Sequence, residues 1–269
     1  MASDYLEKNR EHWDAMVDAH WESDFYDVAG WLEGRERFPE IDTAMLPPLA
    51  GKRLLHLQCH FGQDTLTLAR RGAIVTGADI SSRAIERANE LAGLASLQGT
   101  FVHSDVYGLP DRLEGQFDVV YTSWGTIGWL PDLKRWAGVL DHFLAPGGVF
   151  VLAEFHPVVW MYGSDRSKLE YSYFNRGPIT EESSLSYSGD EKPATTEVGW
   201  NHPLADVLGA LLGRGFVLEA FEEYDYAPHD CFADTVEVAP GKYQWRGFEG
   251  TLPLSYALRV HKPTRFPEA

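Results

Sequence analysis

The stretch LLHLQCHFGQDTLTLARRGAIVTGADIS, residues 54–81, contains two apolar runs with an amphipathic segment between them. The first run leads into a turn that ends at Gly62, the middle segment turns Leu66 and Ala69 inward, and the second run ends at Asp79. Two runs of strand length separated by a helix are typical of a βαβ unit. An acidic residue that ends the second strand lies where such sheets hold the ribose of a nucleoside ligand. The stretch therefore predicts a parallel sheet with a ligand site at its carboxyl edge.

The alternation of strands and helices continues beyond this unit. Further strands are expected over residues 100–103, 116–124, 147–156, 216–224 and 254–261, and helices over residues 81–93, 130–144 and 202–212. Ser81 is a suitable N-cap for the first of these helices, and Gly93 is its expected stop. The last two strands are joined without a crossover helix, so the last strand should run antiparallel. The pattern predicts a three-layer, Rossmann-like α/β fold with a seven-stranded, mostly parallel sheet.

Two segments interrupt this rhythm. Residues 1–48 carry an amphipathic helix followed by an aromatic stretch, which could form a helical lid or pack on the edge of the sheet. Residues 157–200 are polar and read as an insertion after the fifth strand, with an antiparallel hairpin of residues 171–174 and 195–200. We divide the chain into an N-terminal helical and aromatic arm, 1–48, and a core, 49–269, that contains the insertion.

Composition excludes several classes of partner. The formal net charge is −17, whereas nucleic-acid binding depends on basic patches. No apolar run is long enough to span a membrane, and the polar first residues lack a signal peptide's apolar region, so we expect a cytoplasmic protein without a membrane partner. Cys59 and Cys231 form no metal-binding motif, and the short-spaced pair His56 and His60 would need a nearby carboxylate in the right geometry to hold a metal. No metal site is predicted.

The order and spacing of these elements over residues 51–156 resemble the class I S-adenosylmethionine-dependent methyltransferases of the small-molecule type. The first motif of that family is D/E-x-G-x-G-x-G, which aligns with His56, Gln58, His60 and Gly62. Only the last glycine is therefore present. The resemblance implies S-adenosyl-L-methionine as cofactor, and the departure from the motif predicts that the Gln58 and His60 side chains contact the methionine end of that molecule.

The resemblance also places the turn and the following helix at the methionine end. Gly62 would allow close approach, and Gln63, Asp64 and Thr65 would form the first helical turn. Free backbone N–H groups at a helix N-terminus favour a carboxylate ligand. Asp64 suits the positive end of the helix dipole, and a role as a simple cap is the alternative.

The two following strand ends carry the nucleoside end in that family. Asp79 would accept hydrogen bonds from the ribose diol through its two oxygens, and Ile80 would pack on adenine. Asp105 resembles the acceptor of the adenine amino group, with the amide of Val106 beside it. The alternative for Asp105 is a loop aspartate that caps a turn.

Ser123 and Trp124 end the fourth strand, where the family lines the methyl-transfer point. Trp124 and Trp129 could wall an apolar pocket or attract a sulfonium through their rings, or could simply be core residues. Phe25 and Tyr26 of the aromatic arm are the remaining candidates for contact with the substrate.

His156 ends the fifth strand at the same edge and could act as a general base near neutral pH. His60, His202, His229 and Asp230 are weaker candidates. A base is not obligatory, because methyl transfer often needs only proximity and desolvation.

These observations favour methyl transfer to a small, aromatic or otherwise apolar acceptor by a monomer or homodimer. Two alternatives stay open. An NAD(P)-dependent oxidoreductase would share Asp79 but needs a glycine-rich turn for the pyrophosphate, where this chain has Gln58 and His60. A non-catalytic S-adenosylmethionine-binding module is the other. The acceptor atom cannot be read from these residues.

Overall fold

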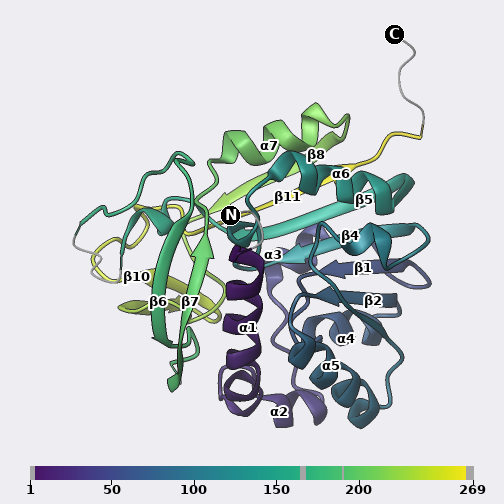
Figure 1. Ribbon diagram of the computed structural model, residues 1–269, viewed down its shortest axis with the longest axis horizontal. Helices are drawn as coiled ribbons and strands as arrows, with labels where there is room; N and C mark the ends of the chain where they lie inside the picture. The colour runs from purple at the N-terminus through teal and green to yellow at the C-terminus, as the bar shows by residue number, and fades with distance from the viewer. Residues whose placement is uncertain (1–3, 164–167, 190, 265–269) are drawn as a thin grey trace.

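A seven-stranded sheet forms the centre of the computed structural model, which describes residues 4–163, 168–189 and 191–264 (Figure 1). In spatial order the strands are β3 (Thr100–His103), β2 (Ile74–Asp79), β1 (Arg53–Leu57), β4 (Phe117–Ser123), β5 (Leu144–Phe155), β11 (Ser255–His261) and β8 (Val217–Tyr224). The pairs among the first five strands are parallel, and β11 is antiparallel to both of its neighbours. This arrangement confirms the predicted fold class.

The α-helices are α1 (Asp4–Glu22), α2 (Val28–Leu32), α3 (Glu40–Met45), α4 (Gln63–Arg70), α5 (Ser82–Ala95), α6 (Leu133–Phe143) and α7 (Leu204–Gly213). Three short 3₁₀ helices cover Leu109–Asp111, Ile127–Trp129 and Val159–Met161. The Ser81 side chain caps α5 as predicted, accepting the Ala84 N–H at 2.9 Å. Gly93 does not end this helix: α5 continues to Ala95, and Ser96 in the left-handed region supplies the stop.

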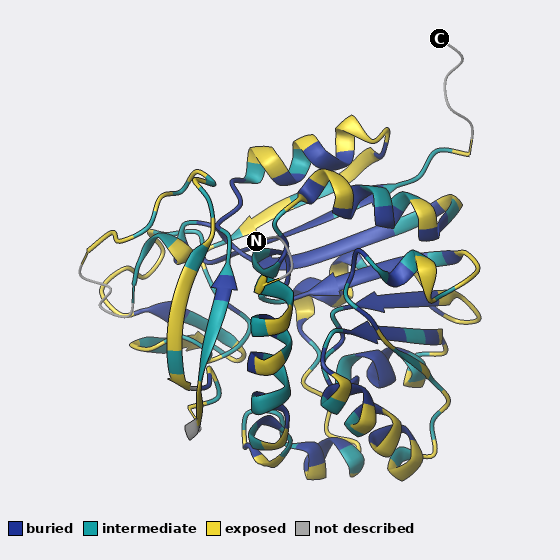
Figure 2. Ribbon diagram, viewed as in Figure 1, coloured by how far each residue is buried: buried dark blue, intermediate teal, exposed yellow. Residues whose placement is uncertain are grey.

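Adjacent residues of the central strands pack on opposite faces of the sheet. Leu55 of β1 belongs to a buried cluster with α6 and α7, whereas Leu54 belongs to a second cluster with α3 and α4. The sheet is therefore covered on both sides, which explains why its strands read as continuous apolar runs. Figure 2 shows these central strands buried, while β8 at the edge is largely exposed.

Two antiparallel hairpins lie outside the sheet: β6 (Ile179–Leu185) with β7 (Glu191–Gly199), and β9 (Thr235–Ala239) with β10 (Lys242–Trp245). The first lies in the predicted insertion, but its leading strand is not residues 171–174. Those residues are held elsewhere, because Tyr171 N donates to the Met161 carbonyl and Asn201 Nδ2 donates to the Ser172 carbonyl. The second hairpin was not predicted from the sequence.

Helix α1 joins the insertion to the core. Asn9, which is buried, forms two hydrogen bonds of 2.8 Å with the backbone of Val198 on β7, one through each end of its amide. On the other side, Asp14 accepts a hydrogen bond from the Ser81 hydroxyl at 2.6 Å. Figure 1 shows α1 running beside β7.

Among the described residues, no helix has the length and apolar character needed to cross a bilayer. The division into arm and core stays a prediction.

Replacing Asn9 by alanine should lower the free energy of unfolding by about 2–3 kcal/mol, because it leaves two backbone groups of Val198 without their partner. Urea denaturation checks this value. Asn89→Ala is the matched control, since the Asn89 amide bonds only the Ile85 carbonyl of its own helix. Equal losses for the two variants would show that the Asn9 contacts add nothing.

Candidate functional site

A cavity of about 1060 Å³ opens at the carboxyl ends of the parallel strands. Its lining includes Asp105 after β3, Asp79 at the end of β2, Gln58 after β1, Trp124 after β4 and Phe155 at the end of β5. Because these strands are neighbours in the order β3-β2-β1-β4-β5, the five side chains follow one another along a single edge. Ligands of open α/β sheets bind in such a crevice.

The cavity brings together most of the residues that the sequence singled out. The predicted site residues that line it are Phe25, Tyr26, Gln58, His60, Gly62, Gln63, Asp64, Asp79, Ile80, Asp105, Val106, Ser123, Trp124 and Trp129. Thr65 and His156 do not line it. Thr65 is buried and its hydroxyl lies 2.8 Å from His56 Nδ1, so it positions a residue that does line the cavity.

The turn between β1 and α4 bends into the cavity through three residues with left-handed backbone, Gln58 (φ 55°), His60 (φ 50°) and Gly62 (φ 74°). This conformation costs a non-glycine residue about 1–2 kcal/mol. Hydrogen bonds hold it: Gln58 Nε2 donates to the Thr126 carbonyl at 2.8 Å, and His60 N donates to Asp79 Oδ2 at 2.8 Å. The turn therefore keeps the backbone shape of a glycine-rich loop while carrying side chains.

Gly62 also serves a second purpose. A Cβ atom at this position would lie 2.6 Å from the ring of Phe101, which is far too close. The absence of a side chain is therefore required by packing on β3 as well as by the positive φ angle. The sequence predicted that Gly62 allows a ligand to approach closely, and this packing against Phe101 is a further reason for a glycine at this position.

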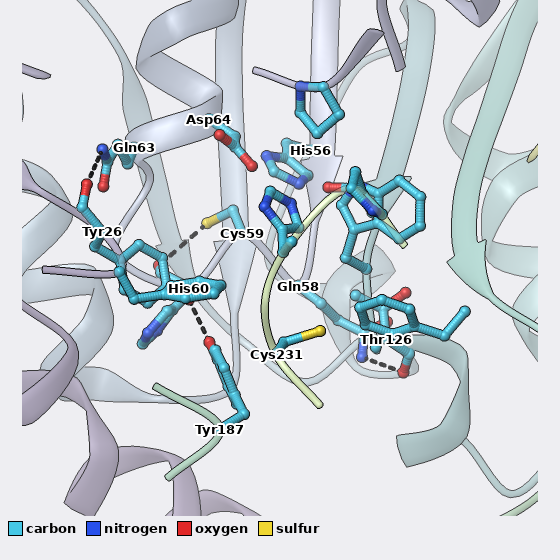
Figure 3. A pocket seen from close by; sticks show the side chains of 18 of the residues that line it. Tyr26, His56, Gln58, Cys59, His60, Gln63, Asp64, Thr126, Tyr187 and Cys231 are labelled. Atoms are coloured by element: carbon cyan, nitrogen blue, oxygen red, sulfur yellow. Dashed lines mark hydrogen bonds between the residues drawn. The ribbon is translucent and has the colours of Figure 1, made fainter. Parts of the chain in front are cut away.

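Four buried polar atoms of this turn and its surroundings have no hydrogen-bond partner among the described residues: His56 Nε2, Gln58 Oε1, His60 Nδ1 and Gln63 Oε1. Gln58 and Gln63 each donate a hydrogen bond through Nε2 to a backbone carbonyl. These bonds fix the direction in which the unpaired Oε1 atom of each side chain points. Leaving such an atom unpaired costs about 1–3 kcal/mol. Figure 3 shows His56, Gln58 and His60 turned toward the same cavity. A ligand that donates hydrogen bonds would satisfy this group.

Acidic side chains lie near the turn between β1 and α4 and farther along the same edge of the sheet. Asp79 is buried, its oxygens accept the N–H groups of His60 and Ser81, and burial raises its pKa to about 6. Two carboxylate oxygens offer about four acceptor positions, so capacity remains for a diol. Burial also raises the pKa of Asp64 to about 6. Asp105 Oδ1 accepts the N–H groups of Tyr107 and Gly108, the turn-capping role considered as an alternative.

The arm and the insertion close over the turn. His20 of α1 lies 2.8 Å from His60 through their ring nitrogens, and Gln63 Nε2 donates to the Tyr26 carbonyl at 2.8 Å. The hydroxyls of Tyr26 and Tyr187, which follows β6, bond to each other. These contacts connect three distant parts of the chain over the cavity (Figure 3).

His156 lies outside the cavity lining. Its ring is 4% exposed, with Nε2 at 3.0 Å from Glu223 and Nδ1 accepting the Val158 N–H. Side chains alternate at the end of β5, so that Phe155 faces the cavity and His156 faces away from it. Burial lowers the pKa of His156. This position does not favour the base role expected for it.

Of the weaker candidates, His60, His229 and Asp230 line the cavity, whereas His202 bonds the Leu130 carbonyl at 2.7 Å outside it. Several other lining residues were not predicted as site residues: Tyr5, Asn9, Trp13, Arg37, Phe38, Trp160, Tyr226, Phe232 and Tyr243. Those after residue 225 reach the site because β9 and β10 fold the connection back, which no local pattern indicated.

The loop that follows β4 is held by two buried acids. Glu154 accepts the backbone N–H groups of Gly125, Thr126 and Ile127. Asp42 accepts hydrogen bonds from the Tyr121 hydroxyl and from Trp124 Nε1, the latter at 3.0 Å. Trp124 is thus positioned by its surroundings and is also part of the cavity wall.

Comparison with known proteins agrees with this geometry. Residues 55–150 match the family model described as a methyltransferase domain. They form a class I methyltransferase domain. This confirms the family indicated by the sequence motifs, despite the changed first motif.

The methyltransferase domain has relatives among characterised and uncharacterised proteins. An uncharacterized methyltransferase of Synechocystis is 35% identical over 131 residues, 48% of this chain and 59% of the relative. A ubiquinone biosynthesis O-methyltransferase of Psychrobacter cryohalolentis is 38% identical over 107 residues, 39% of this chain and 41% of the relative. The chain thus spans about half the length of the curated relatives it matches.

The fold is also that of a solved S-adenosylmethionine-dependent methyltransferase structure from Mesorhizobium loti. The two share 22% identity with a TM-score of 0.56, over 86% of this chain and 99% of the other. At this identity the likeness establishes the common fold.

Asp42 should make stability depend on pH. Burial raises its pKa to about 7 in the folded chain, so the folded state keeps a proton that the unfolded state loses above pH 4. The unfolding free energy should therefore fall as pH rises toward 7, by about 2 kcal/mol between pH 5 and 7 from this group.

Urea denaturation of the wild type and of Asp42→Asn at pH 5, 6 and 7 measures this contribution. Between pH 5 and 7, the unfolding free energy of the variant should fall by about 2 kcal/mol less than that of the wild type, because an amide does not titrate. An unchanged pH profile would contradict the assigned protonation of Asp42.

Proposed function

We propose that the protein transfers a methyl group from S-adenosyl-L-methionine to a small-molecule acceptor. The observation that carries this proposal is the row of side chains along one sheet edge, in which acidic residues over β3 and β2 are followed by polar acceptors over β1 and aromatic rings over β4 and β5. A nucleoside with an attached amino acid fits the side chains over β3, β2 and β1. The side chains over β4 and β5 are then left for an acceptor.

The residues present fit this cofactor. Asp79 retains acceptor capacity for the ribose diol, and Ile80 and Val106 offer apolar contact to adenine. The methionine end carries an ammonium group with three N–H donors, which matches the unpaired Oε1 atoms of Gln58 and Gln63. Burial lowers the pKa of His56 to about 3, so its ring is neutral and Nε2 is available as a further acceptor when Nδ1 carries the proton.

When bound, S-adenosyl-L-methionine supplies a methyl group activated by the positively charged sulfur. The chain's own residues bind, orient and exclude water. Trp124 and Trp129 wall the site beside β4, while Phe25 and Tyr26 close it from the arm. The cavity exceeds the usual volume for one small ligand, about 300–1000 Å³, so it has room for two molecules held together.

Support for a small-molecule acceptor comes from this enclosure and from the relatives, one of which is named as a ubiquinone biosynthesis O-methyltransferase. The oxidoreductase alternative fits less well. A pyrophosphate needs bare backbone at the turn, and Gln58 and His60 place side chains there. Tight binding of NAD in calorimetry, without binding of S-adenosylmethionine or S-adenosylhomocysteine, would overturn the proposal.

Asp79→Asn should weaken the binding of S-adenosylhomocysteine about tenfold, and Asp79→Ala by ten- to a hundredfold, as expected for loss of charged hydrogen bonds of about 1–3 kcal/mol. Isothermal titration calorimetry measures both. Asp118→Asn is the control, since Asp118 lies at the opposite edge of the sheet, where its carboxylate accepts Arg53 N. An unchanged dissociation constant in both Asp79 variants would remove this residue from the site.

Gln58→Met should weaken S-adenosylhomocysteine about tenfold but change the binding of 5′-methylthioadenosine less than twofold. The reason is that the second ligand lacks the amino acid part, so it cannot use the Gln58 acceptor. Calorimetry with both ligands gives the comparison, and circular dichroism establishes that the variant is folded. Equal losses for the two ligands would place Gln58 away from the methionine end.

A further inference from the structure

The end of the cavity over β4 and β5 is walled by aromatic rings. Phe155 lies at the centre, with ring centroids 5.3 Å from Trp124, 4.8 Å from Phe232 and 6.0 Å from Trp160. All four residues line the cavity, and they come from three parts of the chain, since Phe155 and Trp160 are five residues apart. Such walls favour a flat apolar molecule, because aromatic rings bury large areas and stack in defined geometries.

His229 belongs to this aromatic end. Its ring stands perpendicular to that of Trp124 at 6.0 Å and lies 5.7 Å from the ring of Phe25. It lines the cavity, as does Cys231 two residues later, on a segment that passes along the cavity in Figure 3. Neither ring nitrogen of His229 bonds another residue within the part of the chain that the structure describes. The imidazole is therefore packed through its ring and keeps its nitrogens for another partner.

Other titratable groups near this end are engaged. Asp42 accepts from Tyr121 and Trp124, and the Tyr26 and Tyr187 hydroxyls bond to each other. Asp230 accepts from the Thr235 hydroxyl, and Arg37, a permanent cation, donates to the Asp24 and Phe25 carbonyls. His156 faces Glu223 outside the cavity. His56 Nε2 and His60 Nδ1 also lack partners, but these rings belong to β1 and the turn after it, where the methionine end is proposed to bind. At the aromatic end, His229 combines access to the cavity with a free proton-accepting atom.

We propose that the aromatic end of the cavity binds an aromatic hydroxyl compound and that His229 accepts the hydroxyl proton during methyl transfer. This proposal rests on the proposed function and names its acceptor class and base. As the acceptor oxygen forms a bond to the methyl carbon, the carbon–sulfur bond breaks and its electron pair stays on sulfur. The O–H bond then breaks and the proton passes to a ring nitrogen of His229. The positive charge that sulfur loses appears on the imidazole, which releases the proton to water.

The chemistry of the base favours a hydroxyl over an amine. A neutral amine attacks through its own lone pair and can lose its proton afterwards in water, so it gains little from a base within the cavity. Burial and the nearby Arg37 lower the pKa of His229 to about 4, which keeps its ring neutral. An oxygen that is gaining a methyl group becomes strongly acidic, so a base of this strength is sufficient to take its proton.

Equilibrium binding of 2-naphthol and naphthalene to the protein saturated with S-adenosylhomocysteine tests the assignment. The two probes differ only in the hydroxyl group. The wild type should bind 2-naphthol about five- to tenfold more tightly, as expected for one buried hydrogen bond. His229→Phe retains a ring against Trp124 and Phe25, so it should bind naphthalene as the wild type does and lose the preference for 2-naphthol. His156→Gln should keep the preference.

Each result bears on the proposal. A preference retained in His229→Phe, or lost in His156→Gln alone, would overturn the role of His229. Failure of both probes to bind the loaded wild type up to their solubility limits would overturn the aromatic acceptor class. Circular dichroism melting shows that each variant is folded. The affinity for S-adenosylhomocysteine is measured first, so that loss of the cofactor site, which would count against the proposed function, is distinguished from loss of the acceptor site.

Discussion

The hydrogen bond from His60 N to Asp79 Oδ2 is the constraint on which the site depends. It ties the turn after β1 to the end of β2 and holds His60 in a left-handed conformation that a non-glycine residue adopts at a cost. The turn can therefore carry side chains where the related family has glycines. The His60 side chain in turn meets the arm through His20, so this backbone contact also affects how the arm covers the cavity.

Much of the sheet was predictable because its signals are local. The buried runs of β1 and β2, the cap at Ser81 and the antiparallel last strand all follow from composition and connection lengths. The places of Asp79 and Asp105 in the cavity lining were predictable for the same reason, since both residues follow directly from strand ends. These positions needed no knowledge of how distant segments meet.

The aromatic end of the cavity was predicted less well, and His156 shows why. A strand buried on both faces has no polar alternation, so the sequence does not reveal whether Phe155 or His156 faces the cavity. The hairpin of β9 and β10 was missed because its strands are only five and four residues long, which leaves little room for a recognisable alternation. His229 reaches the cavity because this hairpin folds the chain back, and the residues around His229 in the sequence do not indicate that path.

The cover over the cavity also has a kinetic consequence. Asn9 and the contact of Tyr26 with Tyr187 fasten the arm to the insertion, and the contact of His20 with His60 joins the arm to the core. Under the proposed function, separation of these segments, which come from three regions of the chain, would widen the exit for the spent cofactor. Release could then limit turnover as well as chemistry.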